Sequence, residues 1–231
     1  MKLLAFDTST QWLSVTCIAG DDCVSRAERA GQAHSERLLP LIDEVLAEAN
    51  VALGELDAIA FGAGPGSFTG VRIACGVAQG LGLGADLPLV PVSTLEALAE
   101  TAFRLHGAQR VLSCLDARMR EVYVAGYRRE AQRWVSEREA AVLHPADVAA
   151  PVPASAWFGA GDGYTAYPDL AIRLGLAGCD PAIVPDARWI AELARPRIVA
   201  GEAVSAAEAL PLYVRHRVAL TTAERDAGLR M

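Results

Sequence analysis

The chain has 231 residues, enough for one large domain or two small ones with buried cores. Its formal net charge of -7 argues against a dominant nucleic-acid surface, because gripping a phosphate backbone requires clustered Lys and Arg. Hydrophobic residues at 52% and charged residues at 21% are typical of a globular protein and argue against disorder.

The cysteine pattern argues against a disulfide framework or a zinc site. The five cysteines are scattered and form no C-x-x-C pair, which is typical of reduced thiols in a cytosolic protein. Asp7 interrupts the apolar start, and no apolar run reaches the length of about 18 residues needed to span a bilayer. We therefore expect a cytoplasmic protein without a membrane-spanning segment.

The first part of the chain predicts three strands and a helix. Hydrophobic alternation predicts strands over Lys2–Phe6, Trp12–Ala19 and Cys23–Arg29, with a hairpin turn at residues 20–22. Apolar residues at helical spacing predict an amphipathic helix over His34–Ala49.

A glycine-rich turn follows the next predicted strand, Ala58–Gly62. The turn, Gly64–Gly70, opens into a helix over Phe68–Gly84 and lacks the lysine of a Walker A loop. That helix contains several glycines, and each interior glycine costs a helix about 1 kcal/mol relative to alanine. Close packing against another helix would recover this free energy, so the segment predicts a docking surface.

The rest of the chain predicts a second set of strands and helices. A capping box at Ser93–Glu96 predicts a helix ending near His106. The expected order is two adjacent α/β subdomains with mixed sheets flanked by helices, over residues 1–105 and 106–231. Residues 145–185 are left unassigned, and the tail from Leu210 is expected to be extended or frayed. The other predicted elements are a strand over Leu89–Val92, strands over Arg110–Leu115, Glu121–Arg129 and Arg133–Ala140, and a helix over Ala187–Val199.

Four segments together resemble the TsaB family, also called YeaZ: residues 3–10, 64–73, 116–123 and 211–215. The resemblance implies the fold of actin, sugar kinases and ribonuclease H. It also implies a part in making threonylcarbamoyladenosine, the modified adenosine just 3′ of the anticodon in tRNAs that read codons starting with A. In that pathway TsaB works with TsaD, which carries the transferase site and uses threonylcarbamoyl-AMP, and with the ATPase TsaE.

The catalytic paralogue TsaD has a metal-binding His-x-x-x-His pair that this chain lacks. The corresponding positions here hold Thr94 and Leu98, and a leucine cannot coordinate a metal. We therefore expect no catalytic residue and no metal ligand on this chain. The prediction is a non-catalytic partner and activator of TsaD.

Three residues are candidates for cofactor binding. Asp7 occupies the position at which actin-like ATPases have a magnesium-orienting acid, and Gly64 and Gly66 lie in the glycine-rich turn. The alternatives are that Asp7 closes a tight turn through backbone hydrogen bonds, and that the turn is a compact helix entry capped by Ser67. We favour these structural roles and expect no cofactor, with at most a vestigial nucleotide pocket.

Four further segments have a structural and a functional interpretation. His34 is interpreted as a partly exposed residue at a helix start whose ring bonds nearby backbone. Gly161–Gly163 is interpreted as a surface turn in preference to a phosphate loop. Residues 116–123 are interpreted as a hairpin in which Arg118 and Glu121 can pair. The basic segment 213–217 is interpreted as a solvated terminus, with contact to a partner or tRNA as the alternative.

The family resemblance implies docking of the helices His34–Ala49 and Phe68–Gly84 onto the equivalent helices of TsaD. We expect self-association as a homodimer through the same surface, TsaE in the assembled complex, and indirect contact with tRNA. The alternative functions are a peptidase, metal-dependent or otherwise, and an ATP-dependent kinase-like protein. The expected interface residues are Leu38, Ile42, Val71, Ala74, Cys75, Ala78, Gln79 and Gly80.

Overall fold

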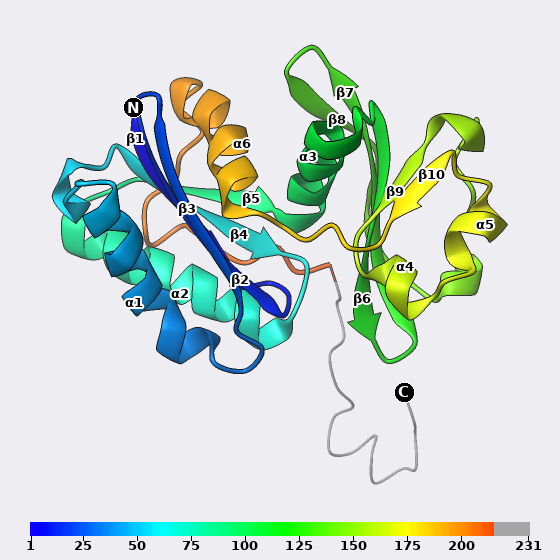
Figure 1. The fold of residues 1–231 in the computed structure, drawn as a ribbon, viewed down its shortest axis with the longest axis horizontal. Helices are drawn as coiled ribbons and strands as arrows, with labels where there is room; N and C mark the ends of the chain where they lie inside the picture. Colours follow the sequence, from blue (N-terminus) through cyan, green and yellow to red (C-terminus); the bar gives the residue numbers. More distant parts are fainter. Residues whose placement is uncertain (215–231) are drawn as a thin grey trace, which may run out of the picture.

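The computed structural model describes residues 1–214, which form two lobes side by side, each built on a five-stranded sheet (Figure 1). In the first sheet the strand order is β3-β2-β1-β4-β5. Strands β1, β2 and β3 form an antiparallel meander, and β4 and β5 continue from β1 in parallel. The strands are β1 (Lys2–Asp7), β2 (Trp12–Ala19), β3 (Asp22–Arg29), β4 (Ala58–Gly64) and β5 (Leu89–Ser93).

The second sheet repeats this arrangement, with the order β10-β9-β6-β7-β8. Strands β6, β7 and β8 form the meander, and β9 and β10 are parallel to β6. This repeated, ribonuclease H-like arrangement confirms the predicted fold class. The strands are β6 (Arg110–Arg118), β7 (Glu121–Glu130), β8 (Arg133–Leu143), β9 (Phe158–Ala160) and β10 (Gly178–Asp180).

Helices α1 (His34–Glu48) and α2 (Phe68–Ala85) lie side by side on one face of the first sheet (Figure 1). The apolar stripe of α1 and the small residues on one side of α2 pack against the side chains of β1, β2 and β4. Burial of this apolar surface is the main source of stability for the layer. Ser67 caps α2, since its hydroxyl accepts a hydrogen bond from the amide of Gly70.

Helices α3 (Thr94–His106) and α6 (Ala187–Val199) are exchanged between the lobes. Helix α3 follows β5 of the first sheet but packs mainly against β6, β7 and β9 of the second. Helix α6 follows β10 of the second sheet and packs against the first, where Ile190 and Ala191 contact its small aliphatic side chains. Residues 200–212 stay with the first lobe, where Val204 pairs with Leu89.

Packing groups the elements differently from the predicted division at residues 105 and 106. Helix α3 belongs by packing to the second lobe, and α6 with the following segment belongs to the first. The prediction divided the chain by sequence order. In the structure, each of these two helices packs its apolar face against the sheet of the lobe that it does not follow in sequence.

The region left unassigned, 145–185, consists of short elements that cover the face of the second sheet opposite to α3. Tyr164, Leu170 and Leu174 pack there against Leu112 and Val124. The elements between β8 and β10 are η2 (Pro145–Asp147), η3 (Ala154–Ala156), α4 (Gly163–Ala166) and α5 (Leu170–Leu174), while η1 (Leu53–Glu55) precedes β4.

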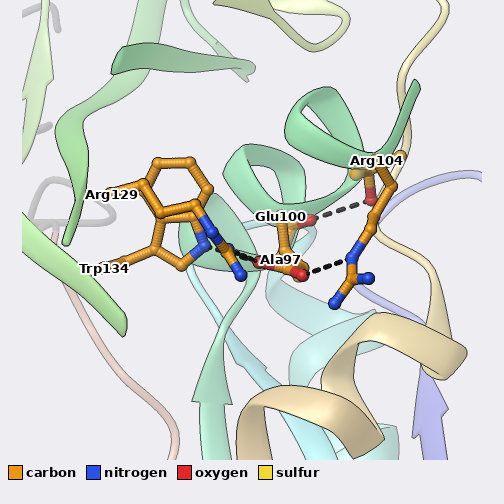
Figure 2. A network of polar contacts seen from close by, with 6 residues as sticks. Ala97, Glu100, Arg104, Arg129 and Trp134 are labelled. Carbon is orange, nitrogen blue, oxygen red and sulfur yellow. Dashed lines mark hydrogen bonds and ion pairs between the residues drawn. The ribbon is translucent and has the colours of Figure 1, made fainter. Parts of the chain in front are cut away.

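A buried carboxylate joins α3 to the second sheet (Figure 2). The Glu100 side chain is 3% exposed and accepts hydrogen bonds from Arg104 at 2.7 Å, from Trp134 at 2.8 Å and from Arg129. Burial alone would raise the pKa of Glu100, but these hydrogen bonds and the charge of Arg129 outweigh it and hold the pKa below its ordinary value. The network fixes α3 against β7 and β8.

The predicted cap of α3 is confirmed in part. The Ser93 hydroxyl accepts a hydrogen bond from the amide of Glu96, as expected of an N-cap. The Glu96 carboxylate pairs with Arg197 of α6 and so connects the two exchanged helices. Within residues 1–214, no helix combines the length and the apolar character required to cross a membrane.

Candidate functional site

Two surfaces are candidates for function: the outer face of the α1–α2 layer and the cleft between the lobes. Helix α2 has glycine on both of its sides. Gly82 faces the core, where an added Cβ would lie 2.8 Å from the side chain of Leu89. Gly76, Gly80 and Gly84 face outward, and an added Cβ at each would meet nothing within 4 Å in the described part of the chain.

The outward glycines lie four residues apart and form one line along α2. The neighbouring surface is apolar in places: the side chain of Leu83 is 80% exposed, and Leu39 on α1 is also exposed. We call the exposed surface formed by five residues of α1 and α2 the outer face: Leu39, Gly76, Gly80, Leu83 and Gly84. A line of small residues lets another helix approach closely.

Most of the expected interface residues lie inside the core. Leu38, Ile42, Ala74 and Ala78 are buried, and so are Val71 and Cys75, so these side chains cannot touch a partner docked on the outer face. Gln79 is half-buried, and its amide donates a hydrogen bond to the carbonyl of Ala209 at 2.8 Å. Gly80 alone of the expected residues is exposed.

The prediction treated every small residue of α2 as one surface, but residues two apart lie on opposite sides of a helix, so that 74, 78 and 82 face the core and 76, 80 and 84 face outward. Exposed leucines at 39 and 83 were missed. The sequence could have indicated them, because each is an apolar residue that lies outside the helical stripe facing the core.

The cleft between the lobes has a volume of about 490 Å³ and is lined by loops that are equivalent in the two repeats. The first-lobe wall includes residues 9–11 after β1 and 65–68 after β4. The second-lobe wall includes residues 115–119 at the end of β6 and Asp162 after β9. Leu212 and Tyr213 line the same cleft.

In the first lobe, the turn after β1 packs tightly on the glycine-rich turn. The amide of Ser67 donates to the carbonyl of Ser9 at 2.7 Å, and the Thr8 hydroxyl donates to the carbonyl of Gly70 at 2.7 Å. An added Cβ at Gly66 or Gly70 would collide with this turn. Gly64 has φ +104°, a conformation that favours glycine. The glycines of this segment thus have a structural reason within the lobe.

Asp7 closes the turn after β1 with hydrogen bonds from Ser9. Its Oδ1 accepts from the Ser9 amide at 2.9 Å and from the Ser9 hydroxyl at 2.8 Å. Its Oδ2 faces Gly62 and has no hydrogen-bond partner among the described residues. Burial raises the pKa of Asp7 to about 7, against the effect of the Ser9 hydrogen bonds.

In the second lobe, the equivalent positions remain polar and reach the cleft. Asp162 Oδ1 accepts a hydrogen bond from the amide of Asp116 at 2.9 Å, and burial raises the pKa of Asp162. Arg118 forms an ion pair with Asp116 at 3.1 Å. Arg118, Met119 and Arg120 all have positive φ, so the predicted hairpin turn is present with three left-handed residues.

The interpretation of residues 161–163 as a surface turn is wrong. Gly161 and Gly163 are buried against Cys114, where an added Cβ would collide with its backbone or its sulfur. This segment is the second-lobe counterpart of the glycine-rich turn, because both follow the fourth strand of their sheet.

Several groups that line the cleft do not favour a bound magnesium–nucleotide. The amides of Ser9 and Ser67 donate within the protein, and Pro65 has no N–H. The second wall presents Asp116 and Asp162, which would repel phosphate. In residues 1–214, no group of three or more His, Cys, Asp or Glu side chains is placed to hold a metal ion.

His34 was expected to be partly exposed, but its side chain is buried. Its Nε2 lies 3.3 Å from the carbonyl of Trp12, so the expected bond to nearby backbone is present. Helix α1 packs against β2, which encloses the ring. Of the basic segment 213–217, residues 215–217 lie outside the described part of the chain.

Comparison with known proteins identifies the family. Residues 26–171 match the model of the family "TsaD: tRNA N6-adenosine threonylcarbamoyltransferase". The chain is 40% identical to the tRNA threonylcarbamoyladenosine biosynthesis protein TsaB of Haemophilus influenzae, over 94% of this chain and 95% of that protein. It is 40% identical to TsaB of Escherichia coli, over 95% of this chain and 96% of that protein.

A solved structure, YeaZ from Pseudomonas aeruginosa, superimposes with a TM-score of 0.87 at 43% identity, covering 92% of this chain and 99% of that one. Identity, coverage and fold agree across nearly the whole length, and the chain belongs to the TsaB family, whose members take part in tRNA threonylcarbamoyladenosine biosynthesis.

Proposed function

We propose that this chain is the non-catalytic partner of a TsaD-type transferase and docks on it through the outer face of α1 and α2. The observation that carries the proposal is the line formed by Gly76, Gly80 and Gly84, with open space at every added Cβ. Each of these glycines costs the helix about 1 kcal/mol relative to alanine, and no contact among residues 1–214 requires them. A partner helix packed against α2 would explain why these positions are glycine.

In the expected mode of association, α1 and α2 pack against two helices of the partner, antiparallel or crossed. The backbone of one partner helix lies over the glycine line of α2. Leu39 and Leu83 would then bury exposed apolar surface at the edges of the contact. The same face offers a surface for self-association when the partner is absent, because two copies would present the same glycine line to each other.

In this proposal the partner transfers the threonylcarbamoyl group from threonylcarbamoyl-AMP to the tRNA adenosine, with AMP as the leaving group. In the same proposal this chain binds no nucleotide of its own, since the amides of Ser9 and Ser67 beside its cleft already donate to other groups of the protein. A TsaE-type ATPase joins the same assembly, which works in the cytosol.

The proposal is tested with Gly80→Leu. The position is exposed and open, so the isolated chain is expected to keep its fold and its melting temperature within a few degrees. A leucine in a close helix contact costs about 1–3 kcal/mol, so affinity for the transferase should fall about tenfold or more. Binding is measured by calorimetry, and tRNA modification by reconstitution with and without this chain.

Thr165→Leu is the matched control, because it adds a leucine at an exposed helical position in the other lobe. It should leave binding and modification unchanged. Ala78→Leu does not test docking, because Ala78 is buried and the larger side chain would disturb the core. Undiminished binding by Gly80→Leu would remove the outer face as the docking surface.

A further inference from the structure

Arginine and aromatic side chains gather at the mouth of the cleft between the lobes. Phe68 and Tyr213 are 51% and 52% exposed and come from the start of α2 and from the segment after α6. Arg118 is 76% exposed and lies at the tip of the β6–β7 hairpin, followed by the exposed Arg120. We call Phe68, Arg72, Arg118, Arg120 and Tyr213 the cleft rim.

Arg72 lies close to both aromatic rings of the rim. Its guanidinium is 3.3 Å from the centroid of the Phe68 ring and 4.9 Å from that of Tyr213, and it donates to the carbonyl of Phe68 at 3.2 Å. Stacking of this kind fixes the plane of the guanidinium and leaves its N–H groups available to a further acceptor. The arginine is therefore preorganised at an exposed position.

The rim differs in charge from the rest of the chain. The whole sequence has a net charge of -7, whereas the rim contributes three arginines, of which Arg118 is paired with Asp116. The short side chain of Asp116 is half-buried, and the arginine extends past it into solvent. An acidic protein that contacts a polyanion must do so through a local cluster such as this one.

We propose that the cleft rim binds the RNA substrate directly, with Arg72 and Arg118 on backbone phosphates and Tyr213 or Phe68 stacked on an unpaired base. This inference rests on the proposed function, in which the partner presents tRNA to its own transferase site. Aromatic side chains and arginine planes are the usual platforms for unstacked RNA bases, and arginine binds phosphate with two N–H groups.

The position of the rim beside the outer face favours RNA as the occupant. Arg72, Gly76 and Gly80 lie at four-residue spacing on α2, so the rim continues the line on which the partner would dock. A tRNA held by a partner on the outer face would meet Arg72 next. The stacked arginine can bind a phosphate, and the exposed rings can stack on a base. An acidic peptide would need the arginines but not the rings.

The test measures tRNA affinity of the assembled complex for the double variant Arg72→Gln/Arg118→Gln. Fluorescence anisotropy with labelled tRNA is recorded at several salt concentrations. We expect the affinity near physiological salt to fall about tenfold, and the slope of log K against log salt to become shallower by about 0.7–0.9 for each lost phosphate contact. Gel filtration records whether the complex still forms.

Arg188→Gln is the matched control. Arg188 is also exposed and lies over an aromatic ring, that of Trp189 at 4.9 Å. It belongs to α6, which packs on the face of the first sheet opposite to α1 and α2. It should change neither the affinity nor the salt slope. Unchanged affinity and slope in the double variant would overturn the proposal, and so would loss of the complex, which would assign Arg72 to the docking face.

A second measurement does not depend on the partner. A short single-stranded RNA carrying photoreactive 4-thiouridine is irradiated with the isolated chain, and cross-linked peptides are identified by mass spectrometry. Cross-links in peptides containing residues 68–72, 118–120 or 213 are expected. Cross-links elsewhere, or none, would contradict direct binding of RNA by the rim, whether or not the docking proposal holds. Binding of an acidic peptide to the rim in the absence of RNA binding would contradict it too.

Discussion

The two lobes have the same strand order but use the loop after their first strand in opposite ways. In the first lobe, Asp7 and the turn behind it are buried, and the glycine-rich turn packs against them. In the second lobe, Asp116 reaches the cleft, and the following hairpin extends Arg118 into solvent. One copy of the repeat has become part of the core, while the other has kept an exposed polar surface.

The same contrast separates the buried carboxylates. Glu100, which anchors α3 to the second sheet, accepts hydrogen bonds from three side chains. Asp7 in the first lobe has one oxygen bonded to Ser9 and one without a partner among the described residues. A buried charge stabilises a fold only where donors compensate its desolvation, so the two carboxylates should respond to substitution in opposite directions.

The largest effect is expected for Glu100→Ala. The variant leaves the guanidinium of Arg129, whose side chain is 8% exposed, without its carboxylate partner. Loss of one member of a buried pair costs about 3–5 kcal/mol. Urea denaturation followed by circular dichroism measures the loss, and Glu100→Gln, which keeps an acceptor, should lose less. A loss below about 1 kcal/mol for Glu100→Ala would mean that the network does not anchor α3.

The next largest effect is a gain in stability for Asp7→Asn. The folded-state pKa of about 7 lies above the unfolded value, so the folded state binds more protons in the window between them. Stability therefore decreases as the pH rises through that window and is lowest above pH 7. The amide keeps the acceptor for Ser9 and carries no charge, so the variant should be more stable by about 2–4 kcal/mol at pH 8.

The gain in stability should be smaller at pH 6 than at pH 8, because at pH 6 the wild-type carboxyl of Asp7 is largely protonated in the folded state. Asp116→Asn at the equivalent position of the second lobe is the control and should change stability by less than about 0.5 kcal/mol, since that side chain reaches the cleft. Equal effects at the two positions would break the contrast between the lobes.

The smallest effect distinguishes the two sides of α2. Gly76→Ala adds a methyl group in open space and should stabilise the isolated chain by about 0.5–1 kcal/mol through helix propensity. Gly82→Ala should instead destabilise it, because the added atom would lie 2.8 Å from Leu89 and 3.1 Å from the carbonyl of Leu87. Thermal unfolding of both variants gives the comparison, and a loss at Gly76 would show that this position is not open.

Local patterns were enough to predict most elements of the fold. The strands of the first sheet and the helices α1, α2, α3 and α6 follow from hydrophobic period, caps and turn residues. Residues 145–185 could not be assigned, because β9, β10, α4 and α5 are each no longer than five residues and carry too little periodicity to be recognised. Their conformation depends on packing against the second sheet.

The site was harder to predict than the fold. The turn at Asp7 and the structural role of Gly66 follow from residue type, and both agree with the hydrogen bonds of the structure. The burial of Ala74 and Ala78 could not be separated from the exposure of Gly80, because composition alone does not assign a small residue to one side of a helix. The burial of residues 161–163 depends on Cys114, which is distant in sequence.

The exchange of α3 and α6 has a consequence for synthesis on the ribosome. The first sheet is translated by residue 93, yet the face that α6 covers stays bare until residue 199 has emerged. At about 5–20 residues per second, that face stays exposed to other chains and chaperones for several seconds. A nascent chain of this architecture cannot complete its first half before its second half exists.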